Sequence, residues 1–318
     1  QRLHFHKRGD VGPQTWHLRN QTQMKVHKKE ECSLGQKLVV GSQVSSLPKL
    51  NQERHRSSAH FFAVPHRISL CIPQKNGNVN FAALVYRIKH NHAPKGISGT
   101  KVVAKTGTMG LKTMRYSDEL LFITRNPYTR FLSLYLQKVE PCMTKVKAGK
   151  LRSMQQCHWS GARDFTHVED FHDFATQVQR KLQRQSLCQI NNHFCSQVSG
   201  CTKNGKEVTL IKLELESEWF PCFARKLQIG DDELEGDQWT EWAGRPCYYS
   251  PSGSCSDWSH ATPTPTHTCG AYHCTDASQH VNQYYTPYVA QLVGEMYKDD
   301  FELLGYPKWD GQSKFTMV

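Results

Sequence analysis

The sequence predicts an α/β domain, because short apolar runs typical of buried strands alternate with longer patterns typical of helices. The buried-strand runs lie at residues 67–72, 119–124 and 208–213. A helical pattern follows each run, and the first of these patterns spans residues 79–88. Such alternation is typical of an open α/β sheet, in which ligands bind beyond the carboxyl ends of the strands.

Length and composition limit the functional classes. The chain has 318 residues, enough for one large α/β domain or two small ones. Its 40 Lys and Arg residues against 28 Asp and Glu give a formal net charge of +12, which favours an anionic ligand or substrate. The 12 cysteines and the glycosylation sequon Asn20-Gln21-Thr22 favour an oxidising compartment. We expect membrane attachment only through a removed N-terminal anchor, because no apolar run is long enough to span a bilayer.

The remaining segments set the expected domain organisation. Residues 1–60 are polar, basic and rich in His, Gln and Ser, with only residues 37–40 resembling buried structure, and they predict an irregular N-terminal arm or stem ahead of a domain at 61–318. The arm lacks the interleaved aromatic residues of single-strand binders, so we expect no nucleic-acid partner. A basic stretch at 140–164 predicts a loop, and the apolar stripe of 165–187 predicts a helix.

The central motif joins the strand at 119–124 to a helix that begins near Pro127, a position where the missing N–H of proline costs little. Arg125 follows the strand, and Arg130 and Ser133 share one face of the helix because they are three residues apart. Two guanidinium groups, a hydroxyl and a helix N-terminus predict an anion site, most simply a phosphate site. The alternative is that Arg125 pairs with a structural carboxylate and that Ser133 is an ordinary helix residue.

A second candidate site lies at the first strand-to-helix turn. A strand, a loop containing Gly77 and a helix follow one another between residues 67 and 88. This order is the general arrangement for binding phosphate with backbone N–H groups, although a purely structural turn has the same pattern.

These motifs resemble those of a known enzyme family. The order Arg125-Asn-Pro-Tyr-x-Arg-Phe-Leu-Ser-Leu-Tyr135 resembles the 3′-phosphate-binding motif of sulfotransferases, the membrane-bound Golgi carbohydrate type in particular, which usually has Asp at the position of Asn126. Lys75 to Phe81 resembles their 5′-phosphosulfate loop, with Gln74 inserted before Lys75 and Val79 where a Thr or Ser is usual. Residues 298–306 are similar to the C-terminal end of the family.

The resemblance implies a three-layer, P-loop-like fold with a central parallel sheet, and 3′-phosphoadenosine 5′-phosphosulfate (PAPS) as cofactor, with adenosine 3′,5′-bisphosphate as product. It implies two groups of cofactor-binding residues. The 5′-phosphosulfate group is Lys75, Asn76, Gly77, Asn78, Val79 and Asn80, where Asn78 or Asn80 would replace the missing hydroxyl. The 3′-phosphate group is Arg125, Arg130 and Ser133, where Arg130 either assists in binding or braces the helix.

The catalytic residues that the resemblance implies are Lys75 and His193, and it implies no metal. His193, Gln197 and Cys201 follow the order of the family segment that carries the base, with a structural histidine as the alternative. Glu214 or Glu216 either positions the acceptor or His193, or simply begins a helix.

The resemblance implies a hydroxyl-bearing glycan as acceptor, which the net charge allows to be anionic, and a location in the Golgi lumen or secretory pathway, with a cytoplasmic location as runner-up. Two alternatives stay open. The first is a sulfotransferase that acts on a small molecule or secondary metabolite. The second is a catalytically lapsed glycan-binding homologue, which the inserted Gln74 and Val79 would explain.

Residues 230–280 resemble a Cys-rich insertion, since the family usually crosses this interval more briefly. Its four cysteines allow three pairings, and we expect two local disulfides. The alternative is a zinc site formed by the last two cysteines and nearby histidines. The expected disulfides are Cys247–Cys255 and Cys269–Cys274, and the zinc ligands would be Cys269, His273 and Cys274 with His260 or His267.

Overall fold

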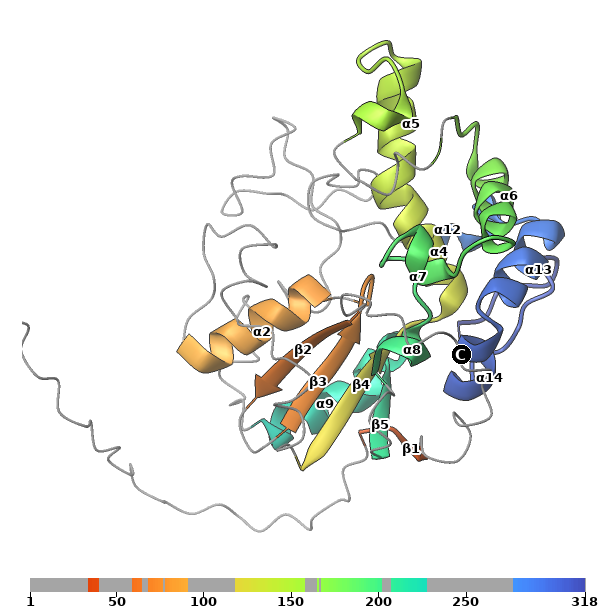
Figure 1. The fold of residues 1–318 in the computed structure, drawn as a ribbon. Helices are drawn as coiled ribbons and strands as arrows, with labels where there is room; N and C mark the ends of the chain where they lie inside the picture. Colours follow the sequence, from red (N-terminus) through yellow and green to blue (C-terminus); the bar gives the residue numbers. More distant parts are fainter. Residues whose placement is uncertain are drawn as a thin grey trace, which may run out of the picture. The chain divides into compact units, whose positions relative to one another are not determined.

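The computed structural model describes residues 34–39, 59–64, 68–76, 78–90, 118–157, 165, 167–201, 207–227 and 277–317 (Figure 1). They belong to one compact unit, Ser33–Val318. The predicted insertion at 230–280, with its expected disulfides and the alternative zinc site, lies outside the described residues, apart from the start of the helix at Ala277. Among the helices of the described ranges, none is long and apolar enough to cross a membrane.

Five strands form the sheet, in the order β1-β5-β4-β3-β2. The three inner strands are parallel to one another, as the sequence predicts, whereas β1 and β2 pair antiparallel with β5 and β3. Parallel neighbours need a long crossover, but only three residues separate β2 from β3, so these two strands pair as a hairpin. The strands are β1 (Gln36–Val39), β2 (Ala59–Val64), β3 (Ile68–Pro73), β4 (Glu119–Thr124) and β5 (Glu207–Lys212).

The central strands are thus parallel, as expected, and the two edge strands add antiparallel pairs that the sequence did not predict. The boundary expected at residue 60 does not separate an irregular arm from the sheet, because β1 lies within residues 1–60 and pairs with β5. The register joins Gln36 to Leu210 and Val39 to Glu207. Part of the segment predicted as an irregular arm thus belongs to the sheet.

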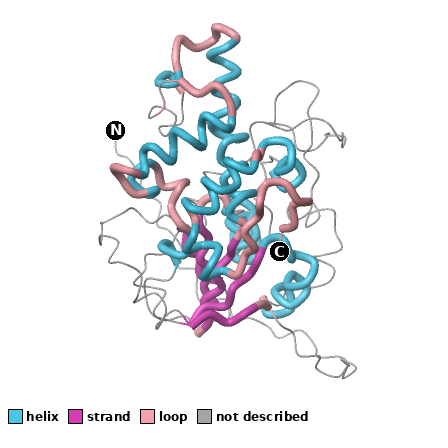
Figure 2. Tube along the Cα trace, turned by 90° about the vertical axis from the view of Figure 1, so that its right-hand side faces the viewer, coloured by secondary structure: helices cyan, strands magenta, loops and turns pink. Residues whose placement is uncertain are grey.

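Helices pack on both faces of the sheet, as Figures 1 and 2 show. On one face, α2 and α9 contribute Phe81 and Trp219, whose rings stack 6.2 Å apart. On the other face lie the helices that carry the larger aromatic core. The helices are α2 (Asn78–His90), α4 (Pro127–Leu134), α5 (Glu140–Lys147), α6 (Phe171–Leu182), α7 (Leu187–Ile190), α8 (Gln197–Cys201), α9 (Glu216–Lys226), α12 (Ala277–Tyr284), α13 (Pro287–Met296) and α14 (Lys298–Leu304).

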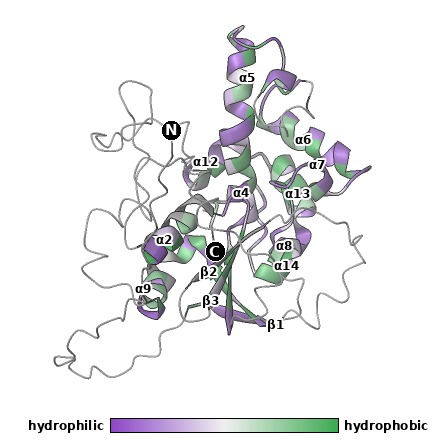
Figure 3. Cartoon of the chain, turned by 60° about the vertical axis from the view of Figure 1, so that its left-hand side comes forward, coloured by the Kyte–Doolittle hydropathy of each residue, from purple (hydrophilic) through white to green (hydrophobic). Residues whose placement is uncertain are grey.

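Successive residues of the buried strands point to opposite layers, which explains why these runs are apolar throughout. In β4, Leu121 and Ile123 pack with α2 and α9, whereas Leu120 and Phe122 pack in the aromatic core. The helices, by contrast, carry alternating hydrophobic and hydrophilic bands (Figure 3), as expected for elements with one solvent-facing side.

The helix that follows β4 is longer than the sequence suggests. A π-helical turn at Tyr135–Val139 connects α4 directly to α5, so the loop expected at 140–164 is wrong for residues 140–147. Pro141 fits because it lies in the first turn of α5. The Cys142–Cys157 disulfide then ties α5 to the segment that follows it.

Two further disulfides connect described residues. Cys71–Cys201 joins β3 to α8, and Cys188–Cys195 joins α7 to the loop that follows it. Cys222 is also disulfide-bonded. These disulfides involve other cysteines than the expected local pairs, which stay predictions. The Cys71–Cys201 pairing spans 130 residues, and only the fold brings its ends together.

The aromatic core should contribute strongly to stability through Phe131, which is 1% exposed and contacts the rings of Phe174 and Tyr297. Phe131→Ala should lower the free energy of unfolding by about 3–5 kcal/mol, because it leaves a cavity among rings that cannot close it. Urea denaturation followed by fluorescence would measure the change. Tyr288→Ala is the control, since Tyr288 is 48% exposed, and it should change stability by about 0.5 kcal/mol or less. Equal losses in both variants would contradict this account of the core.

Candidate functional site

The site lies at the carboxyl ends of β3 and β4, where two loops meet. Lys75 and Asn76 follow β3, and Arg125 and Asn126 follow β4. Because these strands are parallel neighbours, their ends lie at the same edge of the sheet. The Arg125 Nη1 donates to the Lys75 carbonyl over 3.1 Å, so the two loops predicted to form one crevice are in contact.

Lys75 is buried and surrounded by cations. It is 8% exposed, and its ammonium donates to the Gln137 side chain in the π-helical turn. Burial, reinforced by repulsion from Arg125, Lys138 and Arg130, holds the pKa of Lys75 well below its ordinary value. The charged form of a lysine in this setting is stabilised when an anion binds beside it.

The backbone of Lys75 has a φ of +71°, a left-handed conformation that is uncommon for a residue with a side chain. Such strain persists where the surrounding contacts hold the residue in place. The carbonyl of Lys75 is held by Arg125, and its ammonium by Gln137. The two bonds fix the side chain toward the crevice.

Arg125 is the second cation of the site. Its Nε donates to the Thr129 hydroxyl over 3.2 Å, within the first turn of α4. Burial lowers the pKa of Arg125, while the nearby Glu214 carboxylate acts in the opposite direction. Arginine remains charged in such a setting, so the crevice keeps a fixed positive charge next to Lys75.

Asn126, at the position where the family usually has Asp, begins α4. Its side-chain oxygen accepts from the Tyr128 N–H over 2.9 Å, which satisfies a free donor at the helix start. Its side-chain amide donates to the Met317 carbonyl over 2.8 Å. An aspartate could cap the helix but could not donate, so asparagine suits the C-terminal segment of this chain.

Glu214, in the 3-10 turn Leu213–Leu215 that follows β5, supports the same turn. One carboxylate oxygen accepts from the Asn126 N–H over 2.7 Å, and the other accepts from the Tyr306 hydroxyl over 3.1 Å. Burial raises the pKa of Glu214, and the two bonds and Arg125 act against that rise. These contacts give Glu214 a role that the sequence did not predict: it positions the Arg125-Asn126 turn.

Gln197 joins the two loops. Its side-chain oxygen accepts from the Arg125 N–H over 2.9 Å and from the Asn76 amide over 2.6 Å. Its own amide donates to the Arg125 carbonyl over 2.8 Å. The Asn76 amide also donates to the Ile123 carbonyl over 2.8 Å. Gln197 and Asn76 are both fully buried, so their bonds form in an interior where unpaired groups are costly.

Asp300 of α14 holds Gln197 in turn. Its carboxylate accepts from the backbone N–H groups of Gln197 and Val198 over 2.9 and 3.1 Å, at the start of α8. It also accepts from the Ser196 hydroxyl over 2.6 Å. Burial raises the pKa of Asp300, and these donors, together with Arg130, favour its charged form. The end segment at 298–306, which resembles the C-terminal end of the family, therefore has a structural role through Asp300.

Arg130 braces loops on two sides. Its Nε donates to the Gln74 carbonyl over 2.9 Å, and its Nη2 donates to the carbonyls of His193 and Cys195 over 3.2 and 2.8 Å. It is 2% exposed and lies 5.8 Å from the Tyr297 ring centre. In these contacts Arg130 braces the loop before Lys75 and the His193 loop. The inserted Gln74 takes part because its carbonyl accepts one of the bonds.

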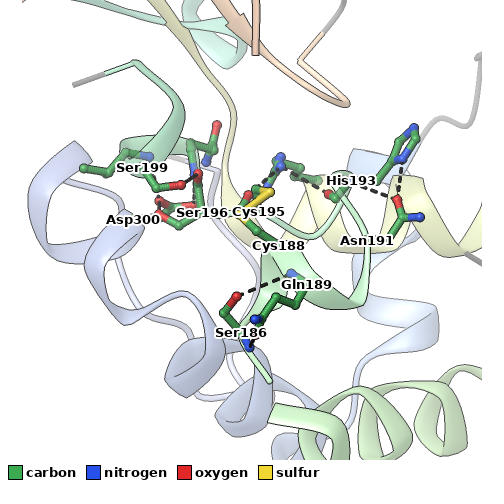
Figure 4. Close-up of a disulfide and its surroundings, with 12 residues drawn as sticks. Ser186, Cys188, Gln189, Asn191, His193, Cys195, Ser196, Ser199 and Asp300 are labelled. Carbon is green, nitrogen blue, oxygen red and sulfur yellow. Dashed lines mark hydrogen bonds between the residues drawn. A yellow bond between two sulfur atoms is a disulfide. The ribbon is translucent and has the colours of Figure 1, made fainter. Parts of the chain in front are cut away.

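His193 lies in the loop between α7 and α8, where it is partly buried (Figure 4). Its Nδ1 is 2.7 Å from the Asn191 side-chain oxygen. Its carbonyl bond to Arg130 connects this loop to α4, the helix of the Arg125 motif. The fold thus ties the candidate base, through one guanidinium, to the candidate cofactor loop.

The remaining predicted residues are placed as follows. Ser133 is buried on α4, at 2% exposed. Gly77 and the side chains of Asn78, Val79 and Asn80 lie outside the described residues, so their expected contacts stay predictions. The described part of the chain shows no cluster of three or more His, Cys, Asp or Glu residues able to hold a metal ion.

Sequence reasoning missed several residues of the site. Gln137 reaches Lys75 because the π-helical turn shifts the helix register, for which the sequence carries no clear signal. Tyr306 and Asp300 come from the far end of the chain. The resemblance of residues 298–306 to the C-terminal end of the family is the signal that could have found them.

Comparison with known proteins agrees with these features. The family model described as the sulfotransferase family matches residues 58–218, half of the chain. The matched segment includes both loops of the crevice, the Arg130 helix and the His193 loop. No curated protein matches the chain, and no solved structure does.

The Gln197 junction should be essential for stability. Gln197→Leu should lower the free energy of unfolding by about 3 kcal/mol or more, because three buried polar groups lose partners at roughly 1–3 kcal/mol each. Chemical denaturation would measure the loss. Gln156→Leu is the matched control, since Gln156 is exposed, and it should cost about 0.5 kcal/mol or less. A Gln197→Leu protein as stable as the wild type would show that the junction is dispensable.

Proposed function

Because this chain belongs to the sulfotransferase family, we propose that it transfers the sulfuryl group of PAPS to a hydroxyl group of a carbohydrate. The observation that carries the proposal is a pair of cations, the buried Lys75 and the half-buried Arg125, at the carboxyl ends of parallel strands. Helices on both faces of the sheet and the parallel β3-β4-β5 core support the three-layer, P-loop-like fold that the sequence resemblance implies.

The residues of the crevice fit a nucleotide with negative groups at both ends. Arg125 and Ser133 would hold the 3′-phosphate beside the N-terminus of α4. Lys75, with backbone N–H groups of residues 76–80, would hold the 5′-phosphosulfate. When bound, PAPS supplies an activated sulfuryl group. Arg130 acts here as the brace of both loops, because its guanidinium donates to three carbonyls.

Electrostatics supports anion binding at Lys75. Charges removed from water interact strongly with a bound anion, and the burial that lowers the pKa of Lys75 is offset when a phosphate approaches. Anion binding would raise this pKa again. Any Lys75 side chain that is neutral in the free protein would then take up a proton. The ammonium would then stabilise negative charge that develops on the leaving phosphate.

His193 would act as the base. The proton of the acceptor hydroxyl would move to its Nε2, because Nδ1 already faces the Asn191 oxygen. Histidine suits this task near neutral pH, where an ordinary imidazole is mostly uncharged. The bond from Arg130 to the His193 carbonyl supports a fixed position of this loop relative to the Lys75 loop.

The acceptor class and the location rest on coarser support. The motifs resemble the carbohydrate type of the family, and the net charge of +12 favours an anionic glycan. Three disulfides among the described residues favour the Golgi lumen or the secretory pathway. A labelled-sulfate transfer screen over neutral glycans, acidic glycans and small hydroxyl compounds would test the acceptor class directly.

Arg125→Ala should weaken the binding of adenosine 3′,5′-bisphosphate by about a hundredfold, since a charge-assisted bond to a phosphate contributes roughly 1.5–3 kcal/mol. The shift of the thermal midpoint on addition of the nucleotide would measure this loss. Arg184→Ala removes an exposed arginine and should leave the shift unchanged. Unaltered binding by Arg125→Ala would refute the assignment of the crevice.

His193→Ala should lower kcat by about 10²–10⁴-fold, the usual contribution of a general base, while nucleotide binding stays close to that of the wild type. Transfer of labelled sulfate and the thermal shift would report the two properties separately. His167→Ala replaces an exposed histidine and should behave as the wild type. Substantial turnover by His193→Ala would remove it as the base.

A further inference from the structure

We infer that Asn191 is the positioning residue of His193: its side-chain oxygen selects the imidazole tautomer that has its proton on Nδ1 and its lone pair on Nε2. The inference rests on the proposed role of His193 as the base. It adds a residue that the sequence did not single out, and it assigns a purpose to the Cys188–Cys195 disulfide, which encloses both residues (Figure 4).

The hydrogen bonds determine the tautomer. The Asn191 oxygen accepts from the His193 backbone N–H over 3.0 Å, and the ring Nδ1 lies 2.7 Å from the same oxygen. A backbone N–H can only donate, so the atom that faces it must be the amide oxygen rather than the nitrogen. An oxygen in that position requires a proton on Nδ1. In a neutral imidazole, Nε2 then carries the lone pair.

This tautomer is the one that proton abstraction needs. As the acceptor is deprotonated, its O–H bond breaks, and the proton forms a new bond with the Nε2 lone pair. The ring becomes a cation that still donates from Nδ1 to Asn191. Because the amide is neutral, it orients the ring without the large rise in imidazole pKa that a carboxylate partner would cause.

The loop that carries the pair is held at three places. The Cys188–Cys195 disulfide joins residues seven positions apart on either side of it. A capping box between Ser186 and Gln189 fixes the start of α7, just before the loop. From the other side, the Arg130 guanidinium binds the carbonyls of His193 and Cys195. A base that must meet a hydroxyl in one geometry benefits from a loop restrained in this way.

The tautomer can be observed directly, without knowledge of the acceptor. In protein labelled with ¹⁵N at histidine, long-range ¹H–¹⁵N spectra distinguish a protonated from an unprotonated ring nitrogen, and His193→Gln assigns the signal. The wild type at high pH should show a proton on Nδ1 of His193. In Asn191→Ala the proton should move largely to Nε2. A wild-type ring that carries its proton on Nε2 would overturn the inference.

Activity gives the second test, with three substitutions in the same loop. Asn191→Ala should lower kcat by about 10–100-fold, by analogy with partners that orient metal-binding histidines, and leave nucleotide binding unchanged. Asn191→Asp keeps the accepting oxygen but adds a charge, so it should keep kcat at high pH and move the acidic limb of the kcat/KM profile to higher pH. Asn192→Ala, at the exposed neighbour, should match the wild type in both respects.

The outcomes separate this inference from the proposed function. If His193→Ala is inactive but Asn191→Ala keeps the wild-type kcat and pH profile, the positioning role is overturned and His193 remains the base. An unmoved acidic limb in Asn191→Asp has the same meaning. If His193→Ala is itself active, the proposed base is wrong. Should Asn191→Ala be unstable, Asn191→Asp and the wild-type tautomer still decide the question.

Discussion

The geometry of the site depends on one buried amide, the side chain of Gln197. It pairs with both backbone groups of Arg125 and with the side chain of Asn76, so it determines where the ends of β3 and β4 lie relative to each other. Its backbone N–H is bound by the Asp300 carboxylate. Since Gln197, Asn76 and Asp300 are fully buried, a displaced Gln197 would leave several polar atoms unpaired at once. The combined free-energy cost of these unpaired atoms keeps the two loops in a single arrangement.

The crevice itself is electrostatically unfavourable in the free protein. Lys75 lies in a left-handed conformation, and the charged groups that act on it, Arg125, Lys138 and Arg130, are all cations. Strain and like-charge repulsion of this kind are destabilising, so they persist only where contacts with neighbouring residues hold the strained group in place. They become useful when an anion binds, because the repulsion is then replaced by attraction. This balance explains why a residue as flexible as lysine is fixed by Gln137 before any ligand arrives.

Local patterns predicted the strand bounds at 67–72, 119–124 and 208–213 to within one residue. The resemblance assigned Lys75 and Arg125 to one nucleotide, and the structure brings their two loops into contact. Sequence reasoning missed the antiparallel edge strands and the helix at 140–147. It could not find Asp300 as the partner of Gln197, since 103 residues separate them and only tertiary packing joins them. Local propensity does not encode such pairs.

Arg130 shows how one motif residue can serve two parts of a reaction. Its spacing from Arg125 suggested a second phosphate contact, yet its guanidinium joins the Gln74 carbonyl on the donor side to the His193 and Cys195 carbonyls on the base side. A planar group with several donors holds those carbonyls at set directions, which a lysine could not do. The helix that carries the phosphate motif therefore also sets the separation between the cationic loop and the candidate base. In-line transfer requires that separation to be fixed, because donor and acceptor must approach from opposite sides of the transferred group.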